Sequence, residues 1–178
     1  EQRRRATGWD PATVERAAER LQSAAEIVRG RGLDVALHPH AATHVESVEE
    51  AEQMLSRTDI GLCIDTGHTV VGGGDPVELA RRHASRLRHV HLKDVDASLL
   101  ARLQRGEVDM DDVWPLGIFC EFGQGVAPIR EFLALPEVRA LDGYGVIEQD
   151  RIAVTVDDMP AVRAADERNR RYVEEALA

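Results

Sequence analysis

The sequence has 178 residues, of which 43% are hydrophobic and 30% charged, a balance typical of one soluble globular domain spanning 1–178. The formal net charge of -10 argues against a nucleic-acid partner, because such binding depends mainly on Lys and Arg neutralising phosphates. No stretch approaches the roughly 20 consecutive apolar residues that cross a bilayer, so we expect no membrane partner and a cytoplasmic location. Its two cysteines fit a reducing compartment better than a disulfide scaffold.

The chain alternates helix-like and strand-like patterns throughout. Amphipathic runs, several of them led by a capping residue or a proline, predict helices at 12–29, 48–57, 76–84, 97–104, 128–135 and 160–177. Compact apolar runs predict buried strands at 33–37, 60–64, 87–92 and 144–147. Apolar strands that alternate with helices favour the α/β class, with a parallel sheet covered by helices. We interpret 72–74 as a flexible turn and 106–125 as a long loop.

Ligand-capable side chains gather where the predicted strands end. Six of the seven histidines lie at or just past these strand ends. Alternate residues of a strand share a face, and the carboxyl ends of parallel strands meet at one edge of the sheet. If the faces converge, four successive strand ends present His38, Asp65, His91 and Glu148 to one point. Two imidazoles and two carboxylates suit Mn, Fe, Co or Zn.

These residues also have structural interpretations. A single histidine at a strand end is more often a hydrogen-bonded structural residue than a metal ligand, and we favour that interpretation for His89 but not for His91. Asp65 precedes Thr-Gly and would serve equally as the first residue of an Asx turn. Glu148 is harder to explain this way, since a carboxylate behind a buried strand needs a partner.

Five segments carry motifs that are shared with one known family: LHPHAATHVES at 37–47, IDTGH at 64–68, GGDPVELARRHASRLRHVHLKDV at 73–95, GIFCEFGQGV at 117–126 and GVIEQD at 145–150. With these motifs the chain resembles the xylose isomerase-like TIM-barrel superfamily, and within it most closely the myo-inosose dehydratases of inositol catabolism. The resemblance implies the C-terminal half of a TIM barrel, because the four strands resemble strands five to eight of the family barrel. Four strands leave both sheet edges open, so we expect a homo-oligomer or a separate N-terminal half-barrel to complete the fold.

The resemblance also implies a site. One divalent metal ion, with Mn, Co or Mg favoured over Zn, would be held by His38, Asp65, His91 and Glu148. A small sugar or keto-polyol would be bound by His40, His68, Glu46 and Gln124. The expected catalytic residues are His68 or His40 as general base, together with Glu148 and Lys93.

The activity implied by the resemblance is that of a metal-dependent dehydratase, a carbon–oxygen lyase that acts on a keto-inositol or similar keto-polyol through an enediolate. Related ketose epimerases have a glutamate where this chain has His38, and the substitution favours dehydration over a two-glutamate epimerisation. A ketose isomerase or epimerase with the same metal stays open, as does a non-catalytic binding module. Abasic-site nucleases of the superfamily are disfavoured, because the chain is acidic and has too few ligands for three metal ions.

Overall fold

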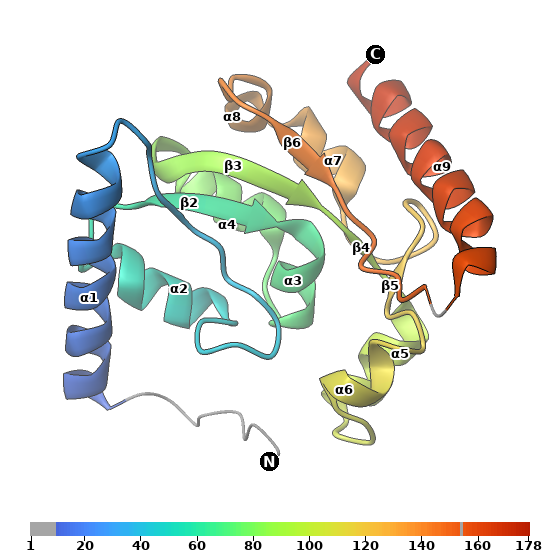
Figure 1. The fold of residues 1–178 in the computed structure, drawn as a ribbon, viewed down its shortest axis with the longest axis horizontal. Coiled ribbons are helices and arrows are strands. Elements are labelled where there is room, and N and C mark those ends of the chain that lie inside the picture. Colours follow the sequence, from blue (N-terminus) through green and yellow to red (C-terminus); the bar gives the residue numbers. More distant parts are fainter. Residues whose placement is uncertain (1–9, 154) are drawn as a thin grey trace.

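The computed structural model describes residues 10–153 and 155–178, and it contains a parallel four-stranded sheet in the order β1-β2-β3-β6 (Figure 1). The strands of this sheet are β1 Ala36–Leu37, β2 Gly61–Asp65, β3 Leu87–Leu92 and β6 Gly145–Ile147. Each pair of neighbouring strands is joined by a crossover that contains helices. This repeated βα arrangement confirms the predicted parallel α/β sheet.

The helices are α1 Pro11–Arg29, α2 Val48–Leu55, α3 Thr66–Val71, α4 Pro76–Arg82, α5 Ala97–Gln104, α6 Met110–Val113, α7 Ile129–Ala134, α8 Pro136–Arg139 and α9 Met159–Leu177. Several begin where the sequence predicts a cap. The Asp10 carboxylate accepts hydrogen bonds from the first backbone N–H groups of α1, and Ser47 forms a capping box with Glu50 at the start of α2. None of the helices in the described ranges is long and apolar enough to span a bilayer.

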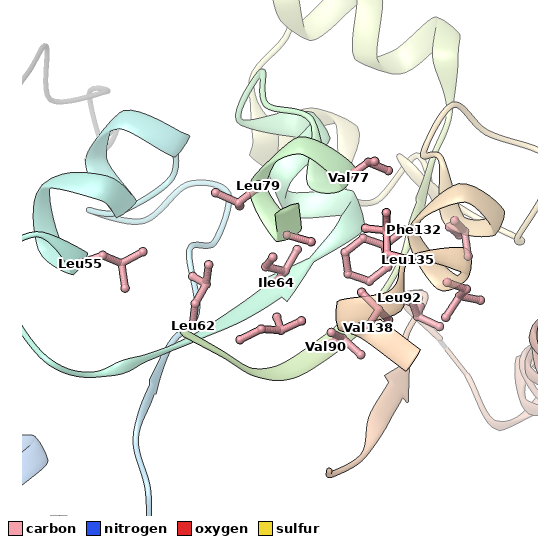
Figure 2. Close-up of a cluster of buried hydrophobic side chains, with 14 of the residues drawn as sticks. Leu55, Leu62, Ile64, Val77, Leu79, Val90, Leu92, Phe132, Leu135 and Val138 are labelled. Carbon is pink, nitrogen blue, oxygen red and sulfur yellow. The ribbon is translucent and has the colours of Figure 1, made fainter. Parts of the chain in front are cut away.

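The main hydrophobic core lies between the sheet and the helices on one of its faces (Figure 2). Leu62 and Ile64 of β2 project into this core beside Val90 and Leu92 of β3, and Phe132 of α7 packs against them. Because strand side chains alternate between faces, the intervening residues of β2 and β3 project from the opposite face. The functional side chains discussed below lie on that opposite face.

The predicted buried strand at 33–37 is wrong in length and in burial. Only Ala36–Leu37 forms β1, both residues are half-buried, and 64% of the Leu33 surface is exposed. β1 pairs with β2 alone, and within the described ranges no other strand pairs with its outer edge. An edge strand without a second neighbour lacks half of its ladder and much of its burial, so it forms over fewer residues.

Two further predictions are corrected by the structure. No helix was predicted between the strand at 60–64 and the helix at 76–84, but the residues that follow β2 form α3. The Asp65 carboxylate caps its first turn, and the turn at 72–74 follows it. The predicted loop at 106–125 contains α6 and the strand β5 Phe119–Cys120, which pairs antiparallel with β4 Asp94–Val95. The Asp94 carboxylate helps to fix the end of this segment, because it accepts hydrogen bonds from four backbone N–H groups, those of Val95, Gly123, Gly125 and Ala127.

Candidate metal centre

The four side chains predicted as metal ligands extend from neighbouring strand ends. His38 directly follows β1, Asp65 is the last residue of β2, His91 lies near the end of β3, and Glu148 directly follows β6. The register of the sheet sets Asp65 beside His91. The backbone N–H of Glu148 donates to the Leu92 carbonyl at 3.0 Å, which carries the pairing with β3 one residue beyond β6.

The ligating atoms of these residues lie close together. His91 Nδ1 is 3.1 Å from Glu148 Oε2 and 3.9 Å from Asp65 Oδ2, while His38 Nε2 is 3.8 Å from the same Asp65 oxygen. Asp65, His91 and Glu148 form a set of potential ligands whose atoms all lie within 4.8 Å of one another. His38 and Asp65 form a second such set with His68, so Asp65 is shared by both.

Two atoms at the centre of this cluster have unused hydrogen-bonding capacity. His38 Nε2 and Asp65 Oδ2 are buried and have no hydrogen-bond partner among the described residues. The other Asp65 oxygen accepts the His68 backbone N–H at 2.8 Å, so the carboxylate caps α3 while Oδ2 faces the cluster and forms an ion pair with Lys93. Burying unsatisfied polar atoms is costly, and a cation between these two atoms would satisfy both. The donor set therefore fits a divalent transition metal.

Lys93 supplies positive charge beside the ligand cluster. Its side chain is 1% exposed, and its Nζ lies 2.7 Å from Asp150 Oδ2, 3.1 Å from Glu148 Oε2 and 3.3 Å from Asp65 Oδ2. Burial alone lowers the pKa of a lysine, but these carboxylates outweigh it and hold the pKa of Lys93 above its usual value. Lys93 is therefore a cation at neutral pH.

Charge and burial also set the protonation of the neighbouring groups. Burial raises the pKa of Asp65, but His38, His68 and Lys93 act in the opposite direction and hold that pKa well below its usual range. Burial lowers the pKa of His91, and the nearby Glu148 opposes this effect only in part. Asp65 is thus a carboxylate and His91 a neutral imidazole at neutral pH, the forms in which both residues bind metals.

His68 lies beneath the cluster, in the first turn of α3. It is fully buried, and burial lowers its pKa to about 2, so the ring is neutral. Lys93 Nζ lies 3.1 Å from His68 Nε2, and the Ala41 N–H lies 3.4 Å from Nδ1. Because a neutral imidazole accepts at one nitrogen only, the shorter and charge-assisted contact identifies Nε2 as the acceptor.

His40 is half-buried and lies between His68 and Trp114. Its ring centroid is 3.6 Å from that of His68, with the two rings tilted by 38°, and the indole of Trp114 stacks on His40 with a centroid separation of 5.9 Å. His40 Nδ1 is 2.9 Å from the Ala41 carbonyl oxygen, which can only accept a hydrogen bond. Nδ1 therefore carries a proton, which leaves Nε2 as the ring nitrogen that can act as an acceptor.

Three residues in or beside the cluster were not predicted as site residues. Asp150 binds Lys93 and lies 3.8 Å from His68 Nε2. Trp114 donates its indole N–H to the Asp150 carbonyl at 3.2 Å. Cys63 of β2 lies beside His38 and His91, and burial raises the pKa of its thiol to about 12. The alternation Glu148-Gln149-Asp150 and the shared face of Cys63 and Asp65 were visible in the sequence, but the strand-end argument assigned neither Asp150 nor Cys63 to the site.

Two predicted substrate-binding residues do not belong to the ligand sets described above. The Glu46 carboxylate accepts the Ala42 backbone N–H at 3.3 Å, in the segment between β1 and α2. Gln124 is exposed, and its amide nitrogen lies 3.5 Å from Glu121 Oε2. Neither residue belongs to the ligand sets found in the described part of the chain. Their roles stay predictions.

Comparison with protein families gives a match over residues 3–169 to the family described as xylose isomerase-like TIM barrel. Among curated proteins, an inosose dehydratase of Geobacillus kaustophilus is 32% identical over 161 residues, which cover 89% of this chain and 52% of that protein. The rhizopine catabolism protein MocC of Rhizobium meliloti is 37% identical over 134 residues, covering 74% of this chain and 41% of that protein. The chain thus spans about half the length of the curated relatives it matches.

Solved structures support the same fold. The IOLI protein with a binding zinc atom superposes with a TM-score of 0.70 at 13% identity, covering 97% of this chain and 59% of that chain. An L-ribulose 3-epimerase gives a TM-score of 0.67 at 15% identity, covering 97% of this chain and 56% of that chain. At these identities the likeness shows the fold alone, and it confirms the predicted partial barrel. The chain belongs to the xylose isomerase-like TIM barrel family.

Proposed function

We propose that the protein is a metal-dependent carbon–oxygen lyase that removes water from a keto-inositol or a similar keto-polyol. The observation that carries this proposal is the convergence of His38 Nε2 and Asp65 Oδ2, two buried atoms without a hydrogen-bond partner among the described residues, beside His91 and Glu148. The relatives named inosose dehydratase support the substrate class.

The metal would be held by His38, Asp65, His91 and Glu148. When bound, a divalent metal ion supplies positive charge that polarises a substrate carbonyl and its neighbouring hydroxyl. The ligands themselves are positioned by the fold: Asp65 through its cap on α3, and Glu148 through its backbone bond to Leu92. The site is therefore largely preorganised by the sheet.

His40 is the better candidate for the general base. The lone pair of His68 Nε2 is engaged by Lys93, whereas the free nitrogen of His40 is Nε2 and its ring is half-buried rather than fully buried. His40 would accept the proton next to the substrate carbonyl. His68 would support it by ring contact, with a centroid separation of 3.6 Å.

Lys93 would supply the proton for the departing hydroxyl. Its ammonium is a donor at neutral pH because Asp65, Asp150 and Glu148 raise its pKa, and it contacts two of the proposed ligands, Asp65 and Glu148. Glu148 contacts both Lys93 and His91, so it would hold the acid and a metal ligand in one geometry. Protonation of the leaving group by such a donor contributes roughly 10²–10⁴-fold to rate.

Completion of the barrel belongs to the same proposal. β1 and β6 are the two edge strands of the described sheet, and 83% of the Tyr144 surface beside β6 is exposed. The relatives are about twice as long as this chain. A second half-barrel, from an N-terminal segment or from a second copy, would cover both edges and close the site from the other side.

Metal content per chain, measured by inductively coupled plasma mass spectrometry, tests the metal site. Asn at position 65 keeps an oxygen to cap α3 but loses the charge, so Asp65→Asn should fold and lose the metal. Asp75 caps α4 in the same way but lies outside the ligand sets of the described residues, so Asp75→Asn is the matched control and should keep the metal. Equal metal content in both variants would refute the assignment.

Product analysis tests the reaction. Incubation with a keto-inositol should give a product lighter by one water, and the turnover should fall by at least about 100-fold in Asp65→Asn. A rearranged product of unchanged mass would instead identify an isomerase or epimerase. Metal binding without conversion of any keto-polyol would favour a binding module.

A further inference from the structure

Cys63 lies beside two of the proposed ligands, His38 and His91, although the proposed reaction gives it no role. It stands two residues before Asp65 in β2, so both side chains project from the same face of the sheet. Its sulfur lies within 4.8 Å of ligand atoms of both His38 and His91, and these three residues form a third potential ligand set. The residue is 4% exposed.

We propose that Cys63 is a soft ligand of this metal centre, which therefore selects a thiophilic ion such as Zn²⁺ or Co²⁺ over Mn²⁺ or Mg²⁺. The inference rests on the proposed metal site and deepens it, because it concerns which metal the site accepts. It also departs from the expectation, drawn from the family resemblance, that Mn, Co or Mg is favoured over Zn, because it adds Zn²⁺ to Co²⁺ as a preferred ion.

The donor chemistry supports this selection. Imidazole and thiolate ligands favour Zn²⁺ and Co²⁺, whereas Mg²⁺ and Mn²⁺ favour oxygen donors. His38 Nε2 has no hydrogen-bond partner in the described chain, so it is available to a metal that also reaches the sulfur. On coordination the S–H bond breaks, the sulfur–metal bond forms and the proton leaves to solvent, with no change of oxidation state.

A buried cysteine often serves only as a small apolar residue, and the second cysteine provides the comparison. Cys120 lies in β5, is half-buried, and belongs to none of the ligand sets among the described residues. Burial raises the pKa of its thiol to about 12, as it does for Cys63, so the two thiols differ mainly in their neighbours. Cys120→Ser is therefore the matched control for Cys63→Ser.

The experiment uses Co²⁺ as the probe. Full-length protein titrated with Co²⁺ should develop a near-ultraviolet thiolate-to-cobalt charge-transfer band that saturates at one ion per chain. Cys120→Ser should keep the band, and Cys63→Ser and Cys63→Ala should lose it while still binding cobalt through the other ligands. Competition between Zn²⁺ and Mn²⁺ should show the Zn²⁺ preference falling by at least about tenfold in Cys63→Ser.

The outcomes separate this inference from the proposed function. Cobalt bound by the wild-type chain without a charge-transfer band would refute the role of Cys63 and leave the metal site intact. Loss of the band in Cys120→Ser, with retention in Cys63→Ser, would refute it as well. A wild-type chain that binds neither Co²⁺ nor Zn²⁺ would overturn both proposals. The Cys120→Ser spectrum decides the question even if a Cys63 variant fails to fold, because Cys63 is then the one cysteine left in the sequence.

Discussion

Replacing Lys93 with methionine is the sharpest test of the charge balance described above. Methionine is unbranched and of similar length, so the change removes the ammonium while largely keeping the packed volume. Lys93 Nζ contacts Asp65, Glu148 and Asp150 at distances between 2.7 and 3.3 Å. The variant would leave three carboxylates without their shared cation.

The magnitude follows from the burial of each pair. At about 3 Å and an effective dielectric constant of about 20, one charge pair is worth roughly 5 kcal/mol before desolvation is counted. The side chains of Glu148 and Asp150 are 28% and 26% exposed and can turn toward water, but the Asp65 side chain is 0% exposed and cannot. Removing one partner of a buried pair costs about 3–5 kcal/mol, so the free energy of unfolding should fall by that amount.

Urea denaturation of metal-free protein at pH 7 measures this change. Arg82→Met is the matched control, because Arg82 forms its ion pairs with Glu52 and Glu78 at the surface, where the same substitution should leave the midpoint unchanged within error. A loss of less than about 1 kcal/mol in Lys93→Met would show that Asp65 is neutralised by other groups or takes up a proton. The reasoning on the Lys93 cation would then be wrong.

Two further predictions concern the same region. His68 has a folded pKa of about 2 against an ordinary value of 6.5, so unfolded chains bind a proton that folded chains do not, and stability should fall by up to about 1.4 kcal/mol per pH unit as pH drops below 6.5. Urea midpoints between pH 7 and 4.5 check this, and His68→Asn should flatten the slope. A Cβ at Gly67 would lie 2.8 Å from Lys93 Cβ, so Gly67→Ala should cost about 1–3 kcal/mol of stability. Gly30→Ala, whose Cβ would lie 3.4 Å from its nearest neighbours, should be neutral by thermal denaturation, and equal losses in both variants would contradict the argument.

The fold was predictable where local signals are strong. β3 and α5 have the bounds expected from the sequence, 87–92 and 97–104, because an apolar strand and a capped amphipathic helix depend mainly on their own residues. α3 was missed because a short segment with Gly67 and β-branched residues has low helix propensity. Its helix depends on the cap from Asp65, whose orientation is set by the sheet.

The part of the candidate site that lies at the carboxyl ends of the strands was predictable from the sequence. His38, Asp65, His91 and Glu148 were expected to converge, and the structure brings their ligand atoms together in overlapping sets. Asp150 could not be placed in this way, because its backbone adopts a φ of 48°. An Asp can take this conformation, but the sequence does not predict it. Cys63 was interpreted as part of an apolar strand, since a buried thiol usually packs as a small apolar residue even when its spacing from Asp65 places both side chains on one face.

The side chains of β2 alternate between the two faces of the sheet, so this one strand contributes both to the hydrophobic core and to the candidate site. Leu62 and Ile64 face the helices and belong to the main hydrophobic core, while Cys63 and Asp65 face the ligand cluster. Because the first pair is fixed by apolar packing, the second pair is held in position even though it contributes buried charge and an unsatisfied oxygen. The core on one face thus offsets the cost of a polar cluster on the other, which is the condition for a preorganised metal site at the carboxyl end of the sheet.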